Sequence, residues 1–183
     1  YEVTSKDFIG TMGIALDDTK KSIIVGNLTG YDLLNYMNIQ QNIKRKFTVL
    51  SSGYQLSKSI GVTGAGSMEV AGEGADKNLY IIDLGNTYSG FEVTGSTNLT
   101  IRNLTIANAL SSAYAAGSAL NVLSSNATII IDNVLFKNNV AKLSGGAIYN
   151  EGVITELVNS SFVGNGIQSN DGSRVIHGGA IYT

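Results

Sequence analysis

The pentapeptide GGAIY at residues 145–149 recurs letter for letter at residues 178–182, which lie 33 residues further along the chain. A weaker copy, GSAL, lies at residues 117–120, and a more distant one, GFEV, lies at residues 90–93. Sequence self-similarity at a period of about 20 to 50 residues is typical of solenoids, propellers and related repeat architectures. The recurrence therefore predicts that at least the second half of the chain is a stack of similar units.

A second motif, F-x-x-N, alternates with the first and occurs at residues 136–139 and 162–165. An Asn precedes each Phe by three residues, and the same spacing with Ile in place of Phe is found at residues 103–106. Because the two motifs alternate in the same order, equivalent positions are expected to stack in successive units. The repeat-forming residues predicted from the two motifs are Gly145, Gly146, Ala147, Phe136, Asn139, Phe162, Asn165, Gly178 and Gly179.

The units are the size of one coil of a β-solenoid. Each has 26 to 33 residues and contains short runs rich in Ile, Val, Leu and Thr, such as residues 99–106, 127–136 and 153–162. Clusters of Ser, Asn and Gly between the runs are typical of turns. Leucine-rich repeats would show a characteristic Leu spacing, and propeller blades are longer, at about 40 to 45 residues. We therefore predict an all-β fold, a right-handed parallel β-helix in which each repeat forms one coil.

Coils at the ordinary interstrand spacing of about 4.8 Å would place like residues on like. We expect an inward column of Ile106, Phe136 and Phe162, a column of Ala147 with Ala180, and a corner ladder of Asn103, Asn133 and Asn159. The Gly pairs would supply corners with positive φ, which only glycine adopts at no steric cost.

The first half of the chain carries a different, helix-like pattern. Ser5 is placed to N-cap a short helix, a second helix is predicted at residues 31–43, and a strand is predicted at residues 22–26 between them. The apolar positions of the first helix are Phe8, Ile9, Met12 and Leu16. Because an open solenoid end exposes unpaired backbone, we interpret residues 1–46 as an N-terminal helical cap with the first coil. Residues 47–183 would then form the β-helix, interrupted in mid-repeat at the C-terminus.

The composition excludes several classes of function. The 183 residues carry 12 Lys and Arg against 14 Asp and Glu, a formal net charge of −2, so no nucleic acid-binding surface is expected. No Cys is present, which removes disulfides, Cys-ligated metals and thiol catalysis. The Gly-rich run at residues 61–66 lacks both phosphate-binding patterns, and the single acid in the loop at residues 170–173 makes a poor calcium site. We therefore expect neither a cofactor nor a metal.

The alternating G-G-A-I and F-x-x-N motifs resemble the repeat of the chlamydial polymorphic outer membrane proteins and related adhesin-like β-helix proteins. The resemblance covers residues 90–183, and the spacing of its upstream copies is irregular. It implies an autotransporter passenger that is exported, associated with the bacterial outer membrane and exposed on the cell surface. It also implies attachment to a protein or glycan receptor on a host or neighbouring cell, so the principal functional hypothesis is an adhesin-like module.

A polysaccharide lyase or hydrolase is the alternative from another class, because parallel β-helices also host such enzymes. Glycoside hydrolysis requires two carboxylates about 5 to 9.5 Å apart. Asp132 and Glu156 are the best candidates on neighbouring coils, whereas Asp17 and Asp18 lie in the expected cap. His177 precedes a Gly, as in β-helical galacturonases, but their accompanying Asp motifs are missing. We therefore expect no enzymatic activity.

A candidate partner-binding surface follows from the repeat alignment. Tyr149 and Tyr182 hold the same repeat position and would stack on one face, either as an aromatic surface for a partner or as the cover of a core column. Residues 168–176 lengthen one repeat, and insertions in solenoids often map to the binding face. The candidate binding residues are Tyr149, Tyr182, Gln168, Asn170 and Asp171. A third hypothesis is a fibre or surface-layer subunit that associates end to end through its last coil.

Overall fold

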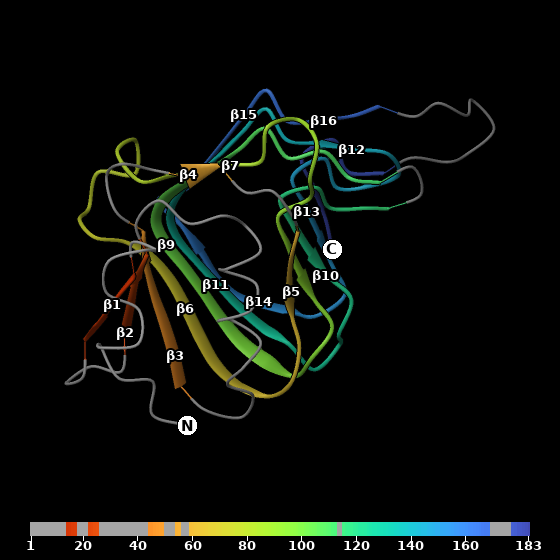
Figure 1. The fold of residues 1–183 in the computed structure, drawn as a ribbon. Helices are drawn as coiled ribbons and strands as arrows, with labels where there is room; N and C mark the ends of the chain where they lie inside the picture. The colour runs from red at the N-terminus through yellow and green to blue at the C-terminus, as the bar shows by residue number, and fades with distance from the viewer. Residues whose placement is uncertain are drawn as a thin grey trace.

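Every regular element in the described part of the chain is a β-strand (Figure 1). The computed structural model describes residues 14–17, 22–25, 44–49, 54–55, 59–112, 115–168 and 177–183. It describes side chains for Val49 and for residues 59–112, 115–168 and 177–183. The strands are β1 (Ile14–Asp17), β2 (Ser22–Val25), β3 (Lys44–Val49), β4 (Tyr54–Gln55), β5 (Ile60–Val62), β6 (Gly66–Gly72), β7 (Ile81–Asp83), β8 (Phe91–Val93), β9 (Thr97–Ala107), β10 (Leu120–Val122), β11 (Thr128–Lys137), β12 (Val140–Ala141), β13 (Ile148–Asn150), β14 (Val153–Val158), β15 (Ser161–Val163), β16 (Gly166–Ile167) and β17 (Ile181–Tyr182).

The strands wind as a parallel β-solenoid, which confirms the predicted fold class. One sheet has the order β2-β3-β6-β9-β11-β14, and another has the order β5-β8-β10-β13-β17, all in parallel pairs. A third stack of parallel strands continues from the first sheet around a corner. In this stack β7 pairs with β4 and β9, and β15 pairs with β11. Figure 1 shows the long strands side by side in one curved wall, facing the shorter row of β5, β10 and β13. The chain passes through four turns between β3 and β14.

The register confirms the alignment of the two G-G-A-I copies with the weaker copy at residues 117–120. Leu120 pairs with Ile148, and Ile148 pairs with Ile181, so Gly117, Gly145 and Gly178 occupy one position. The distant copy at residues 90–93 was aligned wrongly. Phe91 pairs with Leu120, which places Gly90 opposite Ala119 rather than opposite Gly117. The apolar strand residue fixes the register here, because it must enter the core, whereas the Gly can shift.

The first Gly of each motif turns a corner that requires a left-handed backbone. Gly117, Gly145 and Gly178 have φ values of 60°, 60° and 62°. The second Gly is required by the coil that stacks on it. A Cβ added to Gly146 would overlap the carbonyl oxygen of Gly179 in the next coil and lie 2.5 Å from the oxygen of Gly166. The motif is thus a corner that both bends sharply and allows close stacking.

The predicted inward column is present and belongs to the hydrophobic core, with Phe162 packed against it. Ile82, Ile106, Phe136 and Phe162 are paired in that order across successive coils. The rings of Phe136 and Phe162 stack with centroids 4.9 Å apart and planes inclined by 6°. The alanine column is confirmed as well, since the N–H of buried Ala147 donates to the carbonyl of Ala180 over 2.8 Å.

The Asn of F-x-x-N locks each coil to the preceding one. Asn139 is fully buried, its Oδ1 accepts from the N–H of Ala109 and its Nδ2 donates to the carbonyl of Ile106, each over 3.0 Å. Asn165 repeats this pattern one coil later, since its Oδ1 accepts from the N–H of Asn139 and its Nδ2 donates to the carbonyl of Phe136. Each of these side chains therefore satisfies a backbone donor and acceptor on the preceding coil.

The predicted corner ladder of Asn103, Asn133 and Asn159 is present in part. All three have positive φ, at 56°, 54° and 52°, which Asn tolerates better than other residues with a side chain. The Nδ2 of Asn133 donates to Oδ1 of Asn103 over 3.0 Å, as expected. Asn159 departs from the ladder because its Nδ2 donates to the carboxylate of Asp132.

The N-terminal prediction is wrong at Leu16. This residue lies in β1, which pairs antiparallel with β2 and places Leu16 opposite Ile23, so it is not part of a helix. The spacing of Ile14 and Leu16 fits the two-residue period of a strand, just as the position of Leu16 fits the 3.6-residue period of a helix. The pairing with β2 favours the strand, because it supplies hydrogen-bond partners for the backbone of β1. The strand predicted at residues 22–26 is confirmed as β2. Ser5, Phe8, Ile9, Met12 and the helix at residues 31–43 lie outside the described residues. The domain boundary after residue 46 stays a prediction.

Candidate functional site

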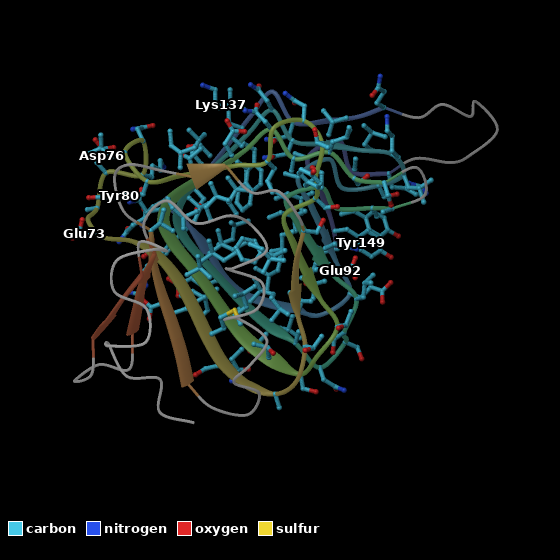
Figure 2. All side chains as sticks on the ribbon, viewed as in Figure 1. Glu73, Asp76, Tyr80, Glu92, Lys137 and Tyr149 are labelled. Carbon is cyan, nitrogen blue, oxygen red and sulfur yellow. The ribbon has the colours of Figure 1, made fainter. Side chains whose placement is uncertain are left out.

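The candidate site is a column of outward-facing residues on the sheet that contains β8, β10, β13 and β17. Glu92, Asn121, Tyr149 and Tyr182 pair in that order across four successive coils. Their strand neighbours point inward, as the burial of Phe91 and Val93 on either side of exposed Glu92 shows. Figure 2 labels Glu92 and Tyr149 on the same side of the solenoid. We call these four residues the tyrosine column.

Tyr149 and Tyr182 stack as their repeat positions predicted. Their ring centroids are 5.3 Å apart and their planes are inclined by 7°. His177 packs against Tyr182 at 5.7 Å with a tilt of 33°. Because the two rings are nearly parallel, each turns one face toward its neighbour, and the ring edges point sideways. The pair lies on the outer side of the sheet, next to inward-facing Ile148, and Tyr182 remains 37% exposed.

Glu151 orients the hydroxyl of Tyr149. The Oη of Tyr149 donates to Oε1 of Glu151 over 2.8 Å. This hydrogen bond stabilises the neutral phenol and, together with partial burial and the nearby carboxylate charge, raises the pKa of Tyr149 above its ordinary value. The phenol therefore stays neutral through the physiological range and presents a fixed polar edge.

Asn121 lies below the tyrosines as a buried polar group. Its side chain is 6% exposed, and its Oδ1 has no hydrogen-bond partner. The register places it between exposed Glu92 and Tyr149. Sequence reasoning missed Glu92, Asn121 and Glu151, although the i, i+2 spacing of Tyr149 and Glu151 could have indicated side chains on the same side of an extended chain.

The predicted insertion is only partly within the described residues. Ile148 and Ile181 are 33 residues apart, whereas Leu120 and Ile148 are 28 apart, which confirms that this coil is longer. The Oε1 of Gln168 accepts from Nζ of Lys142 over 2.9 Å, and His177 forms a parallel bridge with Ser144. Asn170 and Asp171 lie outside the described residues.

The carboxylate pair considered for catalysis is not aligned across the sheet. Glu156 pairs with Ile130, and Asp132 pairs with Val158. Asp132 accepts a hydrogen bond from Asn159, and nearby Arg102 forms an ion pair with Glu69 at 3.1 Å. Asp17 lies in β1, and Asp18 is outside the described residues. Within the part of the chain that the structure covers, no three His, Asp or Glu residues gather to hold a metal.

One stretch of the solenoid corresponds to a known repeat. It begins at the corner residue Asn133, runs through the F-x-x-N lock, β12 and the G-G-A-I corner, and ends at Glu151. Residues 133–151 match the Chlamydia polymorphic membrane protein (Chlamydia_PMP) repeat. This match and the β-solenoid confirm the resemblance that the two motifs indicated. No curated protein and no solved structure gives a significant match to the chain.

The polymorphic membrane protein repeat contributes Tyr149 and Glu151 to the candidate site. Its two motifs build the coil, and the residues directly after the second motif form the outward position of the tyrosine column. The following coil keeps both motifs and supplies Tyr182. Among the described residues, no helix is long and apolar enough to cross a membrane.

Proposed function

We propose that this chain is an adhesin-like module of the polymorphic membrane protein type, wound as a right-handed β-helix and exported to the bacterial surface as part of an autotransporter passenger. The observation that carries the proposal is the polymorphic membrane protein repeat at residues 133–151, built into a coil of the solenoid. The family name supports an association with the outer membrane or cell surface. The solenoid supports a binding role, because stacked coils provide an extended, rigid surface.

The tyrosine column is the proposed contact surface. Its stacked rings present edges and hydroxyl groups sideways, the carboxylate of Glu151 accepts from the Tyr149 hydroxyl, and Glu92 lies two coils below Tyr149 in the same column. A sugar ring that stacks on an aromatic face would find the facing sides of these two rings occupied by each other, and His177 packs against Tyr182 as well. Hydrogen bonding to the Tyr149 hydroxyl and to Glu92 suits a protein partner better, since Tyr is enriched in protein interfaces with its polar tip at the rim.

We further propose that the module has no catalytic activity. The chemistry of glycoside hydrolysis needs two carboxylates held on opposite sides of a bond. Asp132 accepts a hydrogen bond from Asn159, and Glu156 is offset from Asp132 by two residues on the neighbouring strand. The engagement of Asp132 by Asn159 supports a binding role over the polysaccharide-cleaving alternative.

The test is a panel of glycans and host-surface proteins incubated with the chain, in which retained protein and newly formed saccharide ends are scored together. Retention without cleavage is expected. Tyr149→Ala should weaken retention at least severalfold, and Tyr149→Phe should show how much of the loss is due to the hydroxyl. Tyr88→Ala, another partly exposed tyrosine on a different part of the coil, is the matched control. Saccharide cleavage, or equal retention by Tyr149→Ala and wild type, would overturn the proposal.

End-to-end association is a second proposal with its own observation. The coil of β14 and β15 exposes apolar side chains, including Val153 at 52%, Val163 at 51% and Leu157 at 38%. Leu157 lies in the same inward column as buried Ile131 and Ile101, and among the described strands none pairs with β14 on its other side. Sedimentation at rising concentration tests the proposal, and a monomer at every concentration would contradict it.

A further inference from the structure

One corner of the solenoid differs from the equivalent corners of the later coils. In the β9 coil, two residues separate Arg102 from Thr105, and the β11 and β14 coils turn the same corner with two residues each. In the β6 coil, the paired positions are Ala71 and Ile81, so that nine residues, 72–80, occupy this corner. The corner of the β6 coil therefore carries seven additional residues.

These additional residues extend along the outside of the solenoid toward its later coils. The carbonyls of Tyr80 and Lys77 accept hydrogen bonds from the N–H and the hydroxyl of Thr105 in the β9 coil, each over 2.8 Å. The carbonyl of Ala75 accepts from Nδ2 of Asn133 in the β11 coil over 2.7 Å. The Nζ of Lys77 donates to the carbonyl of Asn159, between β14 and β15, over 2.8 Å. The loop thus contacts three successive coils.

The loop is held in this position by its own contacts. The ring of Tyr80 is 8% exposed and lies so close to Gly72 that a Cβ there would be 2.5 Å from Cδ2 of the ring. The carboxylate of Asp76 accepts from the backbone N–H and from Nδ2 of Asn78, which closes the tip of the loop. Figure 2 shows Glu73, Asp76 and Tyr80 together on one side of the molecule.

We propose that residues 73–80 act as a clasp that couples the β6 coil directly to the β11 and β14 coils. In a simple solenoid each coil contacts only its neighbours, so the last coil opens independently of the central ones. The contacts of Ala75 and Lys77 reach two and three coils away and add a connection that nearest-neighbour stacking lacks. Opening of the β14–β15 coil then requires that Lys77 release Asn159.

Native-state amide hydrogen exchange of the intact chain tests the clasp. Lys77→Met keeps the aliphatic stem but removes the ammonium that donates to Asn159. We expect the amides of β14 and β15 to exchange about three to ten times faster in this variant, because an exposed, charge-assisted hydrogen bond is lost. The amides of β5 and β8, which the clasp does not contact, should keep their wild-type rates. Lys137→Met, in the exposed part of β11, is the matched control.

A second variant tests the contact with the β11 coil. Asn133→Gly keeps the left-handed corner but removes the donor to Ala75, whereas Asn103→Gly removes a ladder partner and leaves the bond to Ala75 in place. Faster exchange in β14 and β15 with Asn133→Gly, beyond that with Asn103→Gly, supports the clasp. Wild-type rates there in both Lys77→Met and Asn133→Gly would overturn it. An equal acceleration of all amides would also overturn it, because the loop would then contribute only to global stability.

Discussion

At the scale of single residues, Asn139 is the clearest case of a side chain that holds two coils together. It satisfies the N–H of Ala109 and the carbonyl of Ile106 in a place where water has no access. Asn139→Ala leaves both backbone groups buried without their partner, and we expect it to lower the free energy of unfolding by about 3 kcal/mol. Urea denaturation followed by circular dichroism measures this. Asn126→Ala, at an exposed turn, is the control and should change stability by less than about 0.5 kcal/mol. A loss in Asn139→Ala no larger than in the control would contradict the locking role.

The hydroxyl of Tyr149 gives a prediction for alkaline pH. Its pKa is raised above 10.0 chiefly by the hydrogen bond that it donates to Glu151. Because the pKa in the folded chain exceeds that in the unfolded chain, the stabilisation is fully present below pH 10.0 and is lost as the pH rises through the folded value. Glu151→Gln should move the ionisation of Tyr149 to lower pH, as followed by ultraviolet absorbance of tyrosinate. Glu156→Gln is the control, and an equal titration of both variants would show that Glu151 has no such influence.

At the scale of one element, the G-G-A-I corner offers a matched pair of glycines. A Cβ at Gly146 would overlap the carbonyl of Gly179, whereas a Cβ at Gly179 would meet nothing within 4 Å. Neither residue has positive φ, so the comparison isolates the stacking of coils. Ser118 occupies the equivalent position one coil earlier, and its hydroxyl donates a hydrogen bond to the carbonyl oxygen of Gly146. The methyl group of an alanine could not form this bond. We expect Gly146→Ala to lower stability by about 2 kcal/mol and Gly179→Ala to change it by less than about 0.5 kcal/mol. Thermal unfolding compares the two, and similar midpoints would contradict the close-stacking explanation.

The elements that the sequence predicted well are those whose residues recur. The Phe136–Phe162 stack and the Tyr149–Tyr182 stack follow from two motifs at constant register, since parallel coils place equivalent residues above one another. The pattern around Leu16 predicts a helix, but a few apolar residues fit the period of a helix and the period of a strand equally well. Only the pairing of β1 with β2 decides in favour of the strand. The loop at residues 73–80 has no recurring signal. Its contacts join coils that are distant in sequence, such as Lys77 to Asn159, and no local pattern encodes such a pair.

At the scale of the whole molecule, the solenoid is a one-dimensional stack, and its stability should vary along its axis. Ile101 and Ile131 are fully buried because coils cover them on both sides, whereas Leu157 in the same column is 38% exposed. Burial of apolar surface is the main source of stability, so the central strands β9 and β11 should open least often. We expect their amides to be the slowest in native-state hydrogen exchange, with those of β14 and β15 at least about tenfold faster. The clasp reduces this difference without removing it, because Lys77 holds the last coil at one exposed point only. Equal protection of β11 and β14 would mean that the coils unfold as one cooperative unit, in which case the single-residue effects at Asn139 and Gly146 would appear as changes in global stability rather than as local opening.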